Sequence, residues 1–244
     1  MNPDAPDFEP PEGEPRNIAG SGKPARERII DALLAILPDK SFERITLAEV
    51  AATAGVTLAD MRGEFGSTLS ILTAHMKEVD RAVLAGAEAD DGMDEEPVRE
   101  RLFDALMRRF EILAPHREAI RSLMESARRN PPLALALNGA SVQSMQWMLA
   151  AAGVSNSGPK GMIRAQGLAM LYACAMRTWL KDYDPGLART MAALDRELAR
   201  GHRMAGLLDG LFAIPARACR IVNGGRRRHQ RRRMPRDGDE HYAV

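Results

Sequence analysis

Hydrophobic residues recur along this chain at steps of three and four, which is the pattern of helices that bury one face. In the first stretch, which begins just after Pro24, Ile29, Leu33 and Leu37 share such a face. No segment alternates β-branched and polar residues as a strand would. The sequence therefore predicts an all-α fold. The predicted helices cover residues 25–37, 47–54, 58–64, 68 to beyond 83, 97–114, 116–129, 133–152, 160–181 and 185–212.

Two of these helices, within the stretch from Thr46 to Thr68, are short and closely spaced. Thr46 is a predicted N-cap, and Glu49 follows it at the spacing of a capping box. Gly55 supplies the positive φ that ends the first helix, and Thr57 caps the second. This layout is typical of a helix-turn-helix, whose second helix enters the major groove of DNA.

The surrounding residues, 25 to 83, extend that interpretation. They contain ARERIIDALLAIL, SFERITLAEVAATAGV and FGSTLSILTAHM, in that order. In this combination the chain resembles the TetR (tetracycline-repressor) family of transcriptional regulators. The resemblance implies a three-helix helix-turn-helix head, followed by a helical body for ligand binding and dimerisation. It also implies a cytoplasmic, ligand-responsive repressor that binds a palindromic double-stranded DNA operator as a homodimer.

Composition divides the chain into four predicted regions. Residues 1–23 are acidic and Pro-rich and are expected to be disordered. Residues 24–89 form the predicted DNA-binding head, and residues 97–215 form the predicted ligand-binding and dimerisation body. The acidic run DDGMDEE at residues 90–96 separates the two, and residues 216–244 are an Arg-rich tail that is also expected to be disordered.

The resemblance carries DNA contacts onto seven positions of this chain. They are Thr46, Thr57, Leu58, Ala59, Asp60, Arg62 and Thr68. Arg62 is the residue suited to a guanine edge or a phosphate. Asp60 and Glu64 bring negative charge to this face, and Thr68 stands where the family usually has lysine. The acids could accept from cytosine N4 or repel DNA. A scaffold that has lost operator binding is therefore a second interpretation.

Charge is unevenly distributed between the body and the tail. The formal net charge is +1. Residues 217–244 hold nine arginines against Asp237, Asp239 and Glu240, a balance of +6, so residues 1–216 carry −5. The tail is suited to non-specific attraction to nucleic acid or to an acidic membrane, or it is a solvated segment without a role.

The body carries an unusual number of methionines and both tryptophans on two predicted helices. Such flexible and aromatic side chains could line an adaptable pocket for a small apolar ligand. The alternative is that they only fill the core. The candidate residues are Met145, Trp147, Met148, Met162, Tyr172, Met176 and Trp179.

No motif points to catalysis. The five histidines form no HExxH-type pair, and GxSxG, P-loop and GxGxxG sequences are missing. An enzyme is the least expected class, and we predict no cofactor and no metal. Two cysteines at unrelated positions favour a reducing compartment, and neither a secretory signal nor a membrane-spanning run is visible.

A second resemblance concerns residues 100 to 211. The segments RRFEILAPHREAIRSLM and TWLKDYDPGLARTMAALDRELAR, with the region around Trp147, are similar to the C-terminal region of the coenzyme Q biosynthesis accessory protein. That family has a TetR-like fold and binds lipid. The alternative function is therefore a lipid- or isoprenoid-binding accessory protein that has lost operator binding.

Overall fold

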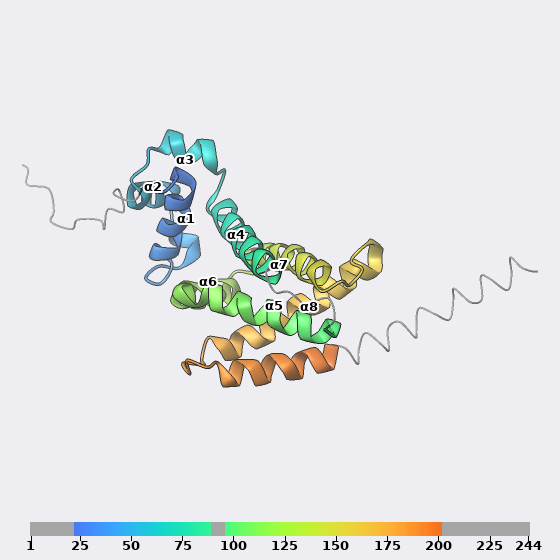
Figure 1. Cartoon of the computed structure of the whole chain (residues 1–244). Coiled ribbons are helices and arrows are strands. Elements are labelled where there is room, and N and C mark those ends of the chain that lie inside the picture. The colour runs from blue at the N-terminus through green and yellow to red at the C-terminus, as the bar shows by residue number, and fades with distance from the viewer. Residues whose placement is uncertain (1–21, 89–95, 202–244) are drawn as a thin grey trace, which may run out of the picture. The chain divides into compact units, whose positions relative to one another are not determined.

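The computed structural model describes residues 22–88 and 96–201, and within these ranges it contains helices and no strand (Figure 1). This confirms the predicted all-α fold. The helices are α1 (Ala25–Ile36), α2 (Leu47–Ala54), α3 (Leu58–Glu64), α4 (Thr68–Glu88), α5 (Val98–Leu113), α6 (Arg117–Arg129), α7 (Pro131–Ala151), α8 (Gly158–Trp179) and a last helix over 188–201, with 3-10 turns η1 (Phe42–Arg44) and η3 (Ala114–His116). None of the helices in these ranges combines the length and apolar character needed to cross a bilayer.

Two helices begin at residues that differ from the predicted starts. The side chain of Asn130 accepts a hydrogen bond from Leu133 N at 3.1 Å, so α7 begins two residues before the predicted start. The last helix begins three residues later than predicted. Leu187 has a φ of 49°, which interrupts the helix before residue 188. Several predicted segments lie outside the described residues. They are the extension of the last helix to residue 212, most of the acidic N-terminal segment, most of the acidic run at residues 90–96, and the Arg-rich tail.

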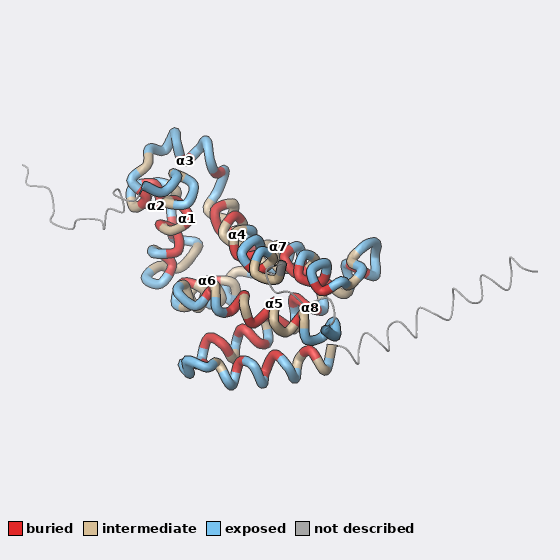
Figure 2. The backbone as a smooth tube through the Cα atoms, in the orientation of Figure 1, coloured by how far each residue is buried: buried red, intermediate tan, exposed pale blue. Residues whose placement is uncertain are grey.

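The buried hydrophobic residues form two clusters within residues 22–198. Figure 2 marks the buried positions along the backbone in red. The head core joins α1, α2, α3 and the first half of α4, and it includes Ala119 of α6. The body core joins the second half of α4 with α5, α7, α8 and the helix that follows residue 187. Ile71 and Leu72 of α4 belong to the head core, whereas Val79 and Val83 belong to the body core. Helix α4 therefore connects the two cores directly.

Helix α6 forms a second connection between head and body. Phe42 N donates a hydrogen bond to Ser126 Oγ at 3.1 Å, and Ser122 Oγ donates to Lys40 O at 3.5 Å. Leu123 of the same helix packs against the head core. A movement of the head relative to α6 must break these contacts.

A buried ion pair connects α4 to the body. Asp80 and Arg109 are only 7% and 3% exposed, and Arg109 Nη1 donates to Asp80 Oδ1. Ser144 Oγ of α7 donates to the same carboxylate oxygen at 2.6 Å, and the Arg109 guanidinium lies 5.6 Å from the centre of the Tyr172 ring. The Asp80 carboxylate of α4 thus binds side chains from both α5 and α7.

His75 of α4 packs against His116 of η3, with ring centroids 5.5 Å apart. Burial, helped by the charge of His116 and then Arg109, lowers the pKa of His75 from 6.5 to about 4, while Asp31 acts in the opposite direction. A lowered pKa means that the folded state binds fewer protons than the unfolded state. The stability that neutral His75 contributes is therefore full above pH 6.5 and is lost as the pH falls towards 4.

We predict that His75→Leu flattens the dependence of unfolding free energy on pH between 6.5 and 4. The measurement is urea denaturation at several pH values, with the parent protein alongside. A variant that loses stability on acidification as steeply as the parent would contradict the prediction. Glu125→Gln, an exposed change on α6, is the matched control and should leave the slope in this window close to that of the parent.

Candidate nucleic-acid interface

The turn between α2 and α3 depends on one glycine. Gly55 adopts φ 62° and ψ 41°, a left-handed conformation that side chains with a Cβ rarely adopt. Its N–H reaches Ala52 O at 3.2 Å, and Val56 N reaches Ala51 O at 3.0 Å, which closes the C-terminus of α2. The chain then turns directly into α3, which buries Met61 beneath it. The pair has the geometry of a helix-turn-helix.

Both predicted N-caps are present, but only Thr57 forms both hydrogen bonds of a capping box. Thr46 accepts from Glu49 N at 3.2 Å, while the Glu49 carboxylate pairs with Lys40 at 2.6 Å. Thr57 instead forms a complete capping box. Its hydroxyl accepts from Asp60 N at 3.1 Å, and Asp60 Oδ2 accepts from Thr57 N and from Thr57 Oγ at 3.3 and 2.7 Å.

This capping box assigns a structural role to Asp60. Hydrogen bonds from the Thr57 side chain and backbone lower the pKa of the Asp60 carboxyl, so it is ionised at neutral pH. A negative charge at the start of α3 also complements the helix dipole. Asp60 Oδ2 thus helps to hold the start of α3, and the contact of Asp60 with DNA stays a prediction.

The remaining predicted DNA contacts lie on the outside of the head. Thr46, Thr57, Ala59 and Arg62 are exposed, Leu58 is 58% exposed, and Thr68 at the start of α4 is half-buried. Leu58 and Arg62 are four residues apart and therefore lie on the same face of α3. This arrangement places an apolar and a cationic side chain together at the surface.

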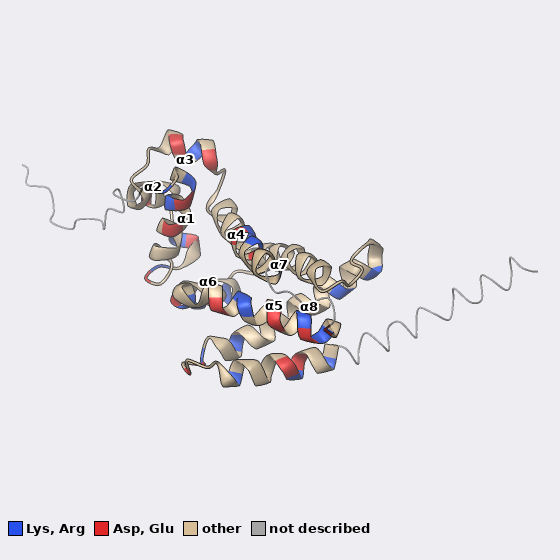
Figure 3. Cartoon of the chain, viewed as in Figure 1, with Lys and Arg blue, Asp and Glu red and all other residues tan. Residues whose placement is uncertain are grey.

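Electrostatics on the head are nearly balanced (Figure 3). Residues 22–65 hold six lysines and arginines against seven aspartates and glutamates. Several acids are matched, because Glu64 lies 3.6 Å from Arg26 and Glu49 is paired with Lys40. Arg62 forms no ion pair with any described residue, which leaves its guanidinium available to an external acceptor.

One cation near the turn was not among the predicted residues. Arg28 of α1 donates from Nη1 to Gly55 O at 3.4 Å, and its charge contributes to the lowered pKa of Asp60. It lies 27 residues from that carbonyl, so no local sequence pattern indicated the contact.

The residues predicted to bind a ligand separate into two groups. Met145, Met148, Tyr172, Met176 and Trp179 are all buried in the body core. There Phe110 stacks on Tyr172 and Trp179, with centroids 4.8 and 5.5 Å apart. Trp147 and Met162 are exposed, and Met162 Sδ contacts Gln146 Nε2 at 3.8 Å. Their assignment to a ligand stays a prediction.

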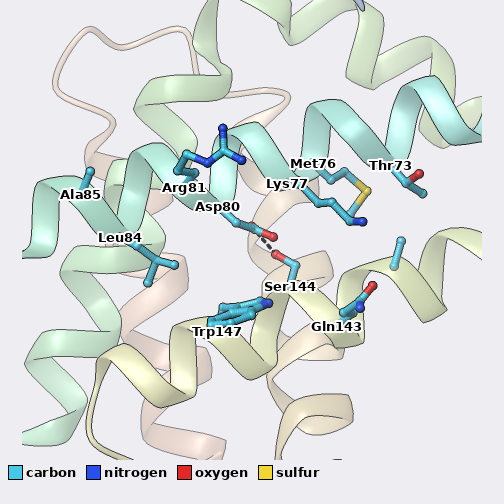
Figure 4. Close-up of a pocket in the computed structure, with 11 residues that line it drawn as sticks. Thr73, Met76, Lys77, Asp80, Arg81, Leu84, Ala85, Gln143, Ser144 and Trp147 are labelled. Atoms are coloured by element: carbon cyan, nitrogen blue, oxygen red, sulfur yellow. Dashed lines mark hydrogen bonds between the residues drawn. The ribbon is translucent and has the colours of Figure 1, made fainter. Parts of the chain in front are cut away.

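Trp147 lies instead in a groove between α4 and α7, with a volume of about 570 Å³ (Figure 4). We call this space the α4/α7 groove. Its lining residues are Thr73, Met76, Lys77, Asp80, Arg81, Leu84, Ala85, Ala140, Gln143, Ser144 and Trp147. In the described part of the chain, no group of three or more histidines, cysteines or acids is arranged to hold a metal ion.

No family model and no curated protein matches the sequence. Solved structures do match. A TetR transcriptional regulator from Nitrosomonas europaea is 20% identical with a TM-score of 0.58, and the match covers 74% of this chain and 99% of that one. A TetR transcriptional regulator from a Rhodococcus species is 20% identical with a TM-score of 0.50, and the match covers 72% of this chain and 95% of that one. A tetR-family transcriptional regulator from Streptomyces coelicolor is 16% identical with a TM-score of 0.50, and the match covers 80% of this chain and 87% of that one. At these identities the matches establish the fold.

Proposed function

We propose, on the premise that this chain has the fold of the TetR transcriptional regulators, that it is a DNA-binding transcriptional regulator. The observation that carries the proposal is the exposed outer face of α3, which presents Leu58, Ala59 and Arg62 from a rigidly capped helix. A helix with its capping groups satisfied internally can enter the major groove without losing its own hydrogen bonds. Binding to chromosomal DNA would place the protein in the cytoplasm.

Three of the exposed residues then have a chemical role in contacting DNA. Arg62 donates to a guanine edge, and Leu58 makes an apolar contact with a thymine methyl group. Thr46 contacts a phosphate through its hydroxyl, which still has a proton to donate after accepting from Glu49 N. Asp60 contributes by holding α3 in place, and Arg28 supports the turn.

We further propose that the regulator is a homodimer formed through α8. Ile163, Gly167, Met170 and Cys174 follow one another at steps of four, three and four along the exposed side of this helix. Met170 is 63% exposed. A Cβ on Gly167 would meet no atom within 4 Å, so none of the described residues of the protomer requires glycine there. Close approach of a second α8 would explain both the glycine and the apolar stripe.

Met170→Glu is expected to shift the protein towards monomer, because a charge would be buried in the α8 contact. Sedimentation velocity over a range of protein concentrations measures the change. Leu135→Glu is the matched control, because Leu135 is an exposed apolar residue on α7 that lies outside the stripe. Equal behaviour of the two variants would contradict the α8 interface.

DNA binding itself is tested by selecting duplexes from a randomised pool with the full-length protein. A dimer with two heads should enrich a palindrome whose half-sites lie about one helical turn apart. Failure to enrich any consensus would contradict the proposal. Co-purification of an isoprenoid lipid in that case would favour the accessory-protein alternative, which stays an untested prediction.

A small apolar ligand that regulates DNA binding completes the proposed function. Helix α4 belongs to both cores, so a ligand that prefers one position of α4 relative to α7 would also prefer one position of the head. Regulation requires this difference in affinity between the two positions, because equal affinity shifts no equilibrium.

A further inference from the structure

We infer that the α4/α7 groove is a binding site for an amphipathic organic anion, in which an aromatic or alkyl body carries one anionic head group. Its volume of about 570 Å³ lies within the range of sites for small molecules. One wall is formed by α4 from Thr73 to Ala85, and the other by α7 from Ala140 to Trp147. The inferred binding depends on this groove alone, whereas its regulatory effect depends on the proposed function.

The charge of the groove favours an anion. Lys77 and Arg81 are exposed on α4 and lie four residues apart, on the same face of the helix. Neither forms an ion pair with a carboxylate of the described residues. The neighbouring Glu78 lies 3.9 Å from Arg26, and the charge of Arg81 acts on it more weakly than that of Arg26. Two cations at the edge of one small groove are therefore left for an external partner.

Asp80, the one acid among the described residues that line the groove, does not cancel this charge. Asp80 is buried at the base of the groove, where it accepts from Arg109 and Ser144. Arg109 compensates the charge of Asp80, so this carboxylate offers little attraction to a cationic ligand. The groove therefore selects against cations and in favour of a carboxylate, sulfonate or phosphate group.

The remaining lining residues favour an apolar ligand body. Trp147 is 56% exposed, which is unusual for a side chain of this size, and it extends from the same α7 wall as Ser144 (Figure 4). Met76 and Leu84 extend from the opposite wall, at either end. The tryptophan offers a flat surface for stacking, and the methionine adapts to irregular shapes.

The position of the groove connects binding to the head. The lining stretch of α4, from Thr73 to Ala85, begins at the head core and ends beyond Val83 in the body core. A ligand body inserted between α4 and α7 stabilises one separation of these helices. If the proposed function is correct, occupancy also selects one position of α3 relative to DNA.

The test uses the full-length protein and a matched pair of fluorescent probes. Anilinonaphthalene sulfonate has an aromatic body with an anionic group, and phenylnaphthylamine has the same body without the charge. We expect the Lys77→Ala, Arg81→Ala double variant to bind the sulfonate about five- to tenfold more weakly. Its affinity for the neutral probe should change less than about twofold, because the apolar lining is intact.

Controls separate the groove from the rest of the surface. Lys181→Ala removes an exposed cation elsewhere and should leave both affinities unchanged. Lys77→Arg with Arg81→Lys keeps the charge and should keep sulfonate binding. Trp147→Ala should weaken both probes. Equal sulfonate affinity for the parent and the double alanine variant would overturn the inference, as would equal weakening by Lys181→Ala.

A second readout separates this inference from the proposed function. In the parent, saturating sulfonate probe should change the affinity for a selected duplex, and in the double alanine variant it should not. Probe binding that leaves DNA affinity unchanged would overturn the connection to the head while preserving the site. Failure of duplex selection would contradict the proposed function without changing the probe result.

Discussion

Asp80→Leu is expected to destabilise the protein by about 3–5 kcal/mol, the cost of breaking a buried pair by removing one partner. Arg109 would remain 3% exposed without its carboxylate, and Ser144 would lose its acceptor. Because Asp80 also connects α4 to α5 and α7, the same change should loosen the connection between the head and the body. Urea denaturation at one fixed protein concentration measures the effect.

The contrast between single and double variants makes this prediction specific. Asp80→Leu combined with Arg109→Met removes both charges and should recover most of the lost stability, because a packed apolar pair can replace a buried ion pair. Glu125→Ala breaks an exposed pair with Arg129 on α6 and should cost less than about 1 kcal/mol. A loss of similar size for Asp80→Leu and Glu125→Ala would contradict the account.

Arg62→Ala should weaken binding to a selected duplex by about 5- to 150-fold, which corresponds to about 1–3 kcal/mol for one bidentate contact with a base. It should also relax the preference at one base pair in each half-site. The reason is that Arg62 is exposed on α3 and forms no ion pair within the described residues. Fluorescence anisotropy with the selected duplex and single-base variants measures both effects.

Arg44→Ala is the comparison for this change. Arg44 is also exposed on the head, but it lies in η1 and donates to Ser41 Oγ at 2.9 Å. Its loss should affect all duplexes to a similar and smaller extent, with no relaxation at a single position. If Arg62→Ala leaves both affinity and preference unchanged, the assignment of the recognition face is wrong.

The sequence predicted the helix-turn-helix well because its signals are local. The cap at Thr46 and the left-handed residue at Gly55 each depend on a few neighbouring residues. The role of Asp60 was less predictable. Thr46 and Thr57 are each followed by an acid at the same spacing. Lys40 forms an ion pair with the carboxylate of Glu49, whereas no described residue forms an ion pair with Asp60, which closes the capping box instead.

The candidate ligand site could not be predicted from periodicity. Helix α7 has apolar residues on several sides, so its pattern did not distinguish the buried Met145 and Met148 from the exposed Trp147. The α4/α7 groove joins residues that are about sixty positions apart, and only the packing of the two helices brings them together. The start of the last helix was missed because the positive φ of Leu187 has no signature in its side chain.

Reading of an operator by α3 is tested most directly by binding to a pool of fragmented genomic DNA across salt concentrations, with full-length protein and with a chain ending at residue 216. Both proteins should enrich the same few palindromic fragments, and Arg62→Ala should lose them. Weak binding that falls steeply with salt, enriches no fragment and vanishes when residues 217–244 are removed would mean that the tail arginines alone attract DNA. That result would contradict the proposal that α3 reads an operator.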